Sequence, residues 1–88
     1  MVYGMYAIQD VKTGFMAPIC DMTDVSAARN FESTLMQAKG TYGTHAQDFR
    51  LFRVGDFDVD SGELKPVIPI QLVYDGASYV SHNKKDVI

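Results

Sequence analysis

The segment that decides the fold opens the chain and reads Val2-Tyr3-Gly4-Met5-Tyr6-Ala7-Ile8-Gln9. Successive side chains of a β-strand point to opposite faces of the sheet. Alternation divides the apolar residues into Tyr3, Met5 and Ala7 on one face and Val2, Tyr6 and Ile8 on the other. A strand that is apolar on both faces is typical of the centre of a sheet with both faces covered. Residues 2–9 therefore predict a central strand.

A turn and a second strand are expected next. Asp10 to Gly14 carry turn-forming side chains, and Gly14 can adopt a positive φ without steric cost. Residues 15–19 then return as a strand. Because Pro18 has no amide hydrogen for a ladder, this strand should lie at an edge of the sheet or end at the proline.

Residues 24–38 predict the helix of the domain. Thr23 or Asp24 can cap its first amides, and an aspartate there also complements the helix dipole. Gly40 is suited to end the helix. One apolar stripe runs along it and consists of Ala28, Phe31, Leu35 and Ala38. We expect the two large side chains of this stripe to pack the helix across one face of the sheet.

The second half of the chain predicts three further strands. Residues 40–47 lack periodicity and predict a mobile loop. Strand patterns follow at 49–57, 63–67 and 70–74, with a turn at Asp60-Ser61-Gly62 and limits set by Pro66 and Pro69. The order ββαβββ predicts an α+β domain: an antiparallel sheet of about five strands with one helix packed on one face. An OB-fold barrel, which has its helix elsewhere in the order, stays an alternative.

Length and composition indicate one globular domain over residues 1–74, followed by a polar, flexible tail over residues 75–88. The chain has 88 residues, of which 47% are hydrophobic and 22% charged, which is typical of a folded protein. The formal net charge of −3 argues against a dedicated binder of duplex DNA. Any nucleic-acid surface must therefore be a local patch.

The expected location is the cytoplasm. Cys20 is the only cysteine, so no internal disulfide can form, and a reducing compartment is favoured. The first residues lack the basic lead and apolar run of a signal peptide. Since no run of 18 apolar residues occurs, no membrane contact is predicted.

The acidic segment after residue 55 invites comparison with a calcium-binding loop. Asp56, Asp58 and Asp60 fill the first, third and fifth ligand positions of an EF-hand. Ser61 then stands where a glycine is required, and Val67 stands where a bidentate glutamate is required. We interpret the segment as a solvated hairpin tip, because aspartate and glycine are ordinary turn residues.

No cofactor, bound metal or catalytic residue is expected. Cys20, His45 and Asp48 have the side chains of a nucleophile, a base and an orienting group. Their spacing does not indicate such a site, and we interpret Cys20 as a buried structural thiol and His45 as a loop residue. One cysteine with two distant histidines, His45 and His82, predicts no zinc site. The chain is predicted not to be an enzyme.

The segment of residues 49–54 carries the pattern with the clearest functional meaning. Alternation puts Phe49 and Leu51 on one face and Arg50, Phe52 and Val54 on the other. An arginine beside an aromatic ring offers a π-surface for a base and a cation for a phosphate. Ordinary amphipathic patterning is the alternative, and Arg53 faces away from Arg50 unless a bulge intervenes. The predicted nucleic-acid-binding residues are Arg50, Phe52, Arg53, Lys12 and Lys65.

Several segments resemble one phage family. They include Tyr3-Gly4-Met5-Tyr6-Ala7-Ile8-Gln9-Asp10, Gly14-Phe15-Met16-Ala17-Pro18, Ala28-Arg29-Asn30-Phe31-Glu32, Thr44-His45-Ala46-Gln47-Asp48-Phe49 and Leu51-Phe52-Arg53-Val54-Gly55. Together they cover most of residues 3–64 and resemble the small nonstructural protein of gokushoviruses, single-stranded-DNA phages of the Microviridae. The resemblance implies an accessory role in phage DNA synthesis or packaging, in the cytoplasm of an infected bacterium. It assigns no catalytic residue.

Two main functional hypotheses follow. The first is a non-enzymatic accessory protein that binds single-stranded DNA weakly, as a homodimer, during genome replication or packaging. The second is an interaction module that binds a phage replication or assembly protein, or a host factor, without touching nucleic acid. The acidic charge favours the second, and the arginine–aromatic strand favours the first. A small hydrolase or nuclease has only the acidic turn in its support.

The acidic turn yields a testable prediction about calcium. Because the required glycine and glutamate are replaced by Ser61 and Val67, we expect no stoichiometric binding of calcium at micromolar concentration. Isothermal titration calorimetry measures this directly, and a one-to-one heat at micromolar calcium would show the prediction to be wrong.

Overall fold

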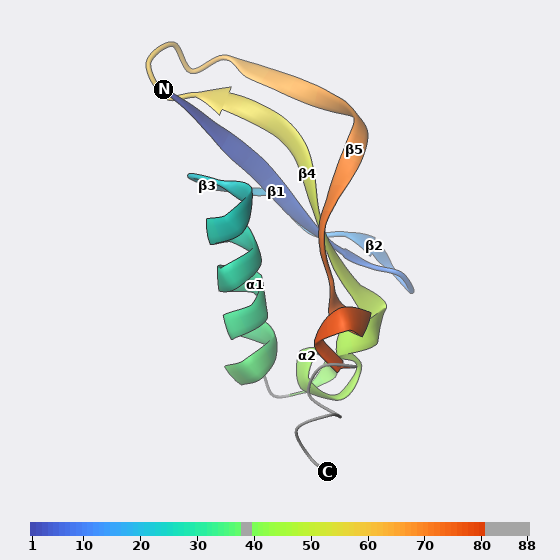
Figure 1. The fold of residues 1–88 in the computed structure, drawn as a ribbon. Helices are drawn as coiled ribbons and strands as arrows, with labels where there is room; N and C mark the ends of the chain where they lie inside the picture. Colours follow the sequence, from blue (N-terminus) through green and yellow to red (C-terminus); the bar gives the residue numbers. More distant parts are fainter. Residues whose placement is uncertain (38–39, 81–88) are drawn as a thin grey trace.

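A twisted antiparallel sheet forms the body of the protein, and one long helix lies along one of its faces (Figure 1). The computed structural model describes residues 1–37 and 40–80. Its five-stranded sheet has the order β2-β1-β4-β5, with β3 also paired to β1. The strands are β1 (Val2–Asp10), β2 (Gly14–Phe15), β3 (Ile19–Asp21), β4 (Phe49–Asp58) and β5 (Leu64–Asp75). The predicted α+β class and antiparallel sheet are confirmed.

Strand β1 is central in the sheet, as its apolar pattern predicted. It pairs with β4 on one side and with both β2 and β3 on the other. The expectation that both faces are covered is wrong, because the helix α1 (Asp24–Gln37) packs only on the face that carries Tyr6 and Leu51. The opposite face has no helix over it in the described part of the chain.

The predicted second strand is divided into two short strands. Residues 14–15 pair with the Gln9–Asp10 end of β1, and residues 19–21 pair with Gly4 to Tyr6. Pro18 lies in the irregular segment between them. Because proline cannot donate to the ladder, the chain leaves β1 there and returns to it further along.

The two strands predicted around Pro66 and Pro69 are one strand, β5. It runs beside β4 as the edge of the sheet, so prolines can face outward without breaking a ladder bond. The register shifts between Arg53 and Gly55, because the stretch of β5 from Pro66 to Gln71 is longer than the stretch of β4 opposite it. We name the β4–β5 hairpin beyond this shift the hairpin arm, residues 55–70. It projects past α1 (Figure 1).

Helix α1 begins where the sequence predicts. The hydroxyl oxygen of Thr23 accepts a hydrogen bond from the Ser26 amide at 3.0 Å, which is the expected N-terminal cap. Its buried stripe consists of Ala27, Phe31 and Leu35, so the expected Ala28 is replaced by Ala27. Ala27 and Ala28 point about 100° apart around the helix axis, and only Ala27 faces the sheet. The predicted helix residue 38 lies outside the described residues.

The predicted mobile loop over residues 40–47 contains helical structure instead. A single turn, α2 (Thr41–Thr44), follows Gly40, and a 3-10 turn, η1 (Ala46–Asp48), leads into β4. Ala46 is buried in the core cluster, which holds this segment against the sheet. A single helical turn is too short to show a period in the sequence, and Gly40 and Gly43 argue against a helix.

The first residues of the expected flexible tail form regular secondary structure instead. Asp75 ends β5, residues 76–80 are helical, and Tyr79 and Val80 pack against the core cluster. A Cβ at residue 76 would collide with the carbonyl oxygens of Ala46 and Phe49, so only glycine permits this close approach. The prediction for residues 81–88 falls outside the described residues.

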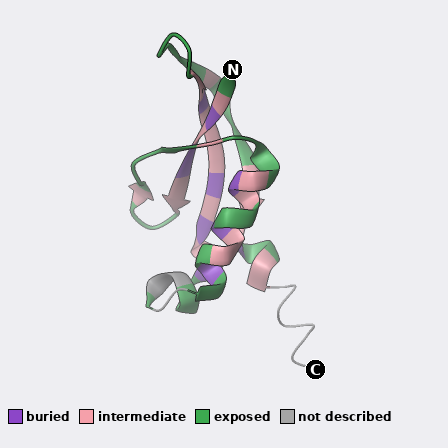
Figure 2. Cartoon of the chain, turned by 90° about the vertical axis from the view of Figure 1, so that its left-hand side faces the viewer, coloured by how far each residue is buried: buried purple, intermediate pink, exposed green. Residues whose placement is uncertain are grey.

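Buried side chains gather where α1 meets the sheet (Figure 2). The core consists of Tyr6, Ala27, Phe31, Leu35, Ala46, Phe49 and Leu51. An edge-on contact between Phe31 and Tyr74, with ring centroids 5.7 Å apart, extends this core to β5. Burial and a hydrogen bond to Glu32 raise the pKa of Tyr74 to about 12. The core therefore lies in the half of the sheet that α1 covers, and the hairpin arm extends beyond it.

Candidate functional site

The face of the sheet opposite α1 gathers the predicted arginine–aromatic pair. We name it the uncovered face. Directly paired residues of antiparallel strands share a face. The register of the sheet therefore puts the following residues on the uncovered face: Tyr3, Met5, Ala7 and Gln9 of β1, Phe15 of β2, Arg50, Phe52 and Phe57 of β4, and Leu64 and Leu72 of β5.

Two phenylalanines form the centre of this face. The rings of Phe15 and Phe52 meet edge to face, with centroids 5.8 Å apart and an interplanar angle of 62°. Phe15 is 51% exposed, and Leu72, paired with Phe52, is 54% exposed. The predicted partner of Arg50 is thus one of two adjacent rings that solvent can reach. Sequence reasoning missed Phe15, although pairing across the turn at residues 10–14 indicates its place.

Arg50 lies beside these rings, between Gln9 on β1 and Asp75 on β5. Its side chain is 43% exposed, and its Nε lies 3.6 Å from an oxygen of Asp75. Within the described residues this buried Nε makes no hydrogen bond. The pairing with Asp75 is therefore loose, and the guanidinium can exchange it for another anion.

The two predicted lysines lie at different ends of the sheet. Lys12 is exposed in the turn between β1 and β2, at the same end as Arg50. Lys65 pairs with Asp56 near the tip of the hairpin arm, on the α1 side of the sheet. Its ammonium lies 3.4 Å from Glu63. The structure thus brings Lys12 toward Arg50 and Phe52, and it separates Lys65 from them.

Arg53 faces the α1 side, as alternation predicted, although a bulge follows it at Val54. Its guanidinium donates to Asp56 at 2.6 Å and to Asp24 at 2.8 Å, and it lies 5.8 Å from the ring centre of Tyr6. The hydrogen bond to Asp56, and then that to Asp24, raise the pKa of Arg53. Arg53 therefore links β4 to the first residue of α1.

Tyr6 completes this cluster, which we name the helix latch: Tyr6, Asp24, Arg53 and Asp56. The tyrosine hydroxyl donates to Asp24 at 2.5 Å. Its ring packs against Gly4, where a Cβ would collide with it. Burial, followed by the hydrogen bond to Asp24, raises the pKa of Tyr6, and the same bond lowers the pKa of Asp24. Sequence reasoning missed the latch, because its members lie far apart in the chain.

The structure separates Cys20 from Asp48, and His82 lies outside the described residues. Cys20 is exposed, so the expected buried thiol is wrong, and its Sγ lies 3.0 Å from the Sδ of Met5. Asp48 lies at the other end of β1, where its carbonyl accepts from the Val11 amide. Among the described residues no three His, Cys, Asp or Glu side chains group as a metal site. In the same residues no helix is long and apolar enough to cross a membrane.

The fold and the site define a small α+β protein with a half-covered sheet and an aromatic, weakly cationic patch on its bare side. Residues 3–79 match the family model described as Phage ORF5 protein. The chain belongs to this family, and it is a phage protein. Neither a curated protein nor a solved structure matches it.

The helix latch gives a prediction for stability. Tyr6→Phe should lower the free energy of unfolding by about 1–2 kcal/mol at neutral pH, because a buried hydroxyl loses its bond to a carboxylate. The folded-state pKa of Asp24 is lowered, so this contribution is present above the ordinary carboxyl pKa of about 4 and is lost as the pH falls below it. Urea unfolding at about pH 7 and pH 2.5 measures both effects.

Tyr3→Phe is the matched control for this prediction. It also removes a tyrosine hydroxyl from β1, but on the uncovered face, away from Asp24. We expect a change in unfolding free energy of less than about 0.5 kcal/mol. If the difference in unfolding free energy between wild type and Tyr6→Phe is the same at neutral and acid pH, the role of Asp24 is contradicted.

Proposed function

We propose that this phage protein is a non-enzymatic accessory factor that binds single-stranded DNA weakly on its uncovered face. The observation that carries the proposal is the contact between exposed Phe15 and half-buried Phe52, with Arg50 beside them. Every base has a π-face, so exposed rings can stack bases of any sequence. A nearby arginine supplies a cation for the backbone phosphate.

The charges of this face favour weak binding. Within residues 1–37 and 40–80, Arg50 and Lys12 are the cations at the Phe15–Phe52 end of the sheet, and Asp75 competes for Arg50. Arg53 and Lys65, also predicted to bind DNA, are engaged with carboxylates on the α1 side. We therefore propose about two phosphate contacts in each protomer and an affinity no better than micromolar near physiological salt.

The resemblance to gokushovirus nonstructural proteins supplies a biological setting for this proposal. Family membership shows a phage protein. We propose that it acts in the cytoplasm of an infected bacterium, during replication or packaging of a single-stranded genome. Binding that is weak and independent of sequence suits a factor that follows newly made strands without blocking their later use.

Salt-dependent binding tests the DNA proposal. Fluorescence anisotropy with a labelled 30-mer should give a slope of log K against log salt of about −1.4, roughly −0.7 for each phosphate. Phe52→Ala should lower the affinity by about 1 kcal/mol or more and leave the slope unchanged. Arg50→Ala should reduce the slope by about 0.7.

Arg29→Ala is the matched control for the arginine variant. Arg29 is exposed on α1, on the other side of the molecule, so its loss should leave the salt slope unchanged. If Arg29→Ala and Arg50→Ala reduce the slope equally, Arg50 acts through the net charge of the protein and not through a phosphate contact. If wild type shows no salt-sensitive binding at low ionic strength, the DNA proposal fails.

The interaction-module hypothesis also has an observation in its favour. Apolar side chains on and near the hairpin arm are unusually exposed: Leu64 by 60%, Ile68 by 85%, Ile70 by 40% and Leu72 by 54%. An edge strand with such side chains invites pairing with a second copy. We propose a symmetric homodimer that forms through β5, and a phage replication or assembly protein as the competing partner of the same surface.

Sedimentation equilibrium tests the dimer. Wild type at micromolar concentration should have about twice the monomer mass of 9.8 kDa. A glutamate placed at Ile68 or Leu72 should leave a monomer, because a charge at the contact would lose its hydration. Met36→Glu is the control, since Met36 is 67% exposed near the C-terminal end of α1, away from the arm. A single 9.8 kDa species for wild type up to high concentration would exclude the dimer.

A further inference from the structure

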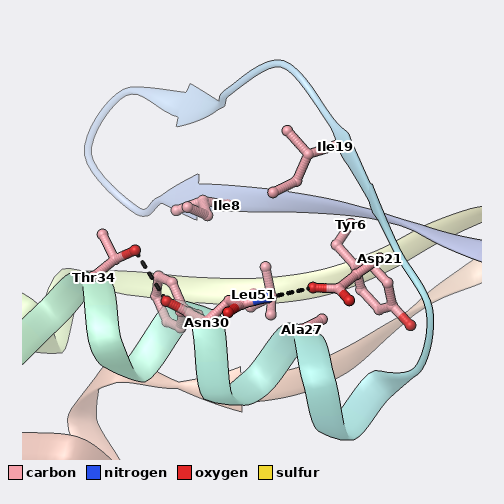
Figure 3. A pocket seen from close by; sticks show the side chains of 9 residues that line it. Tyr6, Ile8, Ile19, Asp21, Ala27, Asn30, Thr34 and Leu51 are labelled. Atoms are coloured by element: carbon pink, nitrogen blue, oxygen red, sulfur yellow. Dashed lines mark hydrogen bonds between the residues drawn. The ribbon is translucent and has the colours of Figure 1, made fainter.

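A small cavity lies on the α1 side of the sheet, between α1 and strand β3 (Figure 3). Its volume is about 70 Å³. The apolar wall consists of Tyr6, Ile8, Ile19, Ala27, Phe31 and Leu51. Ile19 stands at the mouth and is 62% exposed, so the cavity communicates with the surface.

Three polar residues form the rim of this cavity: Asp21, Asn30 and Thr34. The amide nitrogen of Asn30 donates to Asp21 at 2.7 Å, and the hydroxyl of Thr34 donates to the Asn30 carbonyl at 3.0 Å (Figure 3). The hydroxyl hydrogen of Thr34 and one of the two amide hydrogens of Asn30 are therefore occupied. Asp21 is the charged residue among those that line the cavity. The rim thus offers oxygen acceptors and a negative charge to an incoming group.

The size of the cavity indicates what fits inside. An apolar cavity of roughly 150 Å³ accommodates benzene. A volume of about 70 Å³ therefore matches an isopropyl or isobutyl group, the side chain of valine or leucine. Sites for nucleotides and other cofactors are several times larger, at roughly 300–1,000 Å³.

The neighbouring strand favours a peptide as the carrier of that group. In the described residues β3 pairs with β1 alone, so its other edge keeps main-chain groups available. An extended peptide can add to such an edge and insert alternate side chains into an adjacent pocket. The cavity lies beside this edge, between β3 and α1 (Figure 3).

We propose that the cavity is a docking site for an extended segment of a partner protein, which inserts one valine- or leucine-sized side chain and places a lysine or arginine against Asp21. Hydrogen bonds from the Ser26 side chain, Asn30 and the Met22 amide keep the pKa of Asp21 low, so the carboxylate is charged at neutral pH. The site lies on the face opposite Phe52. It is therefore independent of DNA binding and gives the protein a second, separate partner surface.

Methyl-resolved NMR with short peptides tests this proposal. The probe is acetyl-Thr-Lys-Leu-Lys-Thr-amide, and the signals are the methyl groups of Ile8, Ile19 and Leu51, which line the cavity. We expect saturable shifts of these methyls. Replacing the peptide's leucine by alanine, or its lysines by glutamates, should weaken binding at least about 5-fold.

Two protein variants separate the site from the general charge of the molecule. Thr34→Leu fills the mouth and should abolish the methyl shifts, whereas Gln37→Leu, outside the cavity on the same helix, should preserve them. In Asp21→Asn the ratio of the affinities for the lysine peptide and the glutamate peptide should fall to about 1. The circular-dichroism melting curve of each variant confirms that it folds.

Three results would overturn the proposal. They are an absence of methyl shifts with the leucine peptide, equal affinity for the alanine peptide, and a lysine preference that is unchanged in Asp21→Asn. The last result would assign the preference to the net charge of −3 and not to this carboxylate.

Discussion

A single helix of limited length covers this sheet, and most other features follow from that constraint. The 14 residues of α1 span about 21 Å at roughly 1.5 Å per residue. The 12 residues of β5 span about 40 Å at roughly 3.3 Å per residue. One helix therefore buries one face over about half the length of the long strands. No helix covers the hairpin arm or the opposite face in the described residues, and the surfaces proposed for DNA and for the dimer lie there.

The helix latch engages one of the arginines of this acidic protein, so that Arg53 is not available to a ligand. Placing α1 on the sheet brings the carboxylate of Asp24 to the buried ring of Tyr6, and Arg53 stabilises this charge. An arginine that bridges two carboxylates is held in place by three charge-assisted hydrogen bonds. On the other face Arg50 has only a loose contact with Asp75. Two arginines three positions apart on one strand thus have separate roles, one in folding and one available to a ligand.

Periodicity predicted the features that depend on neighbours in the chain. These are the central strand β1, the Thr23 cap of α1, and the opposite faces of Arg50 and Arg53. It did not predict features that depend on distant residues. Local sequence predicts that Pro66 and Pro69 limit strands. Both fit within β5 because β5 is an edge strand, and its place at the edge is set by its pairing, among the described residues, with β4 alone. Likewise, Asp24 is 29 residues from Arg53, and no spacing rule connects them.

The two surfaces proposed for β5 and the uncovered face are not independent of each other. Leu72 pairs directly with Phe52, so a dimer contact that reaches Leu72 would shield the ring that we propose to stack bases. A contact confined to the tip of the arm, around Ile68, would leave both rings free and join two of the proposed DNA sites in one dimer. The first arrangement makes self-association and DNA binding compete, so DNA would favour monomers by mass action. The second makes them cooperate, because the second site then binds at a high effective concentration. Weak individual sites with few phosphate contacts gain most from the second arrangement. The register shift between Arg53 and Gly55 separates the arm from the rings, and this separation favours it.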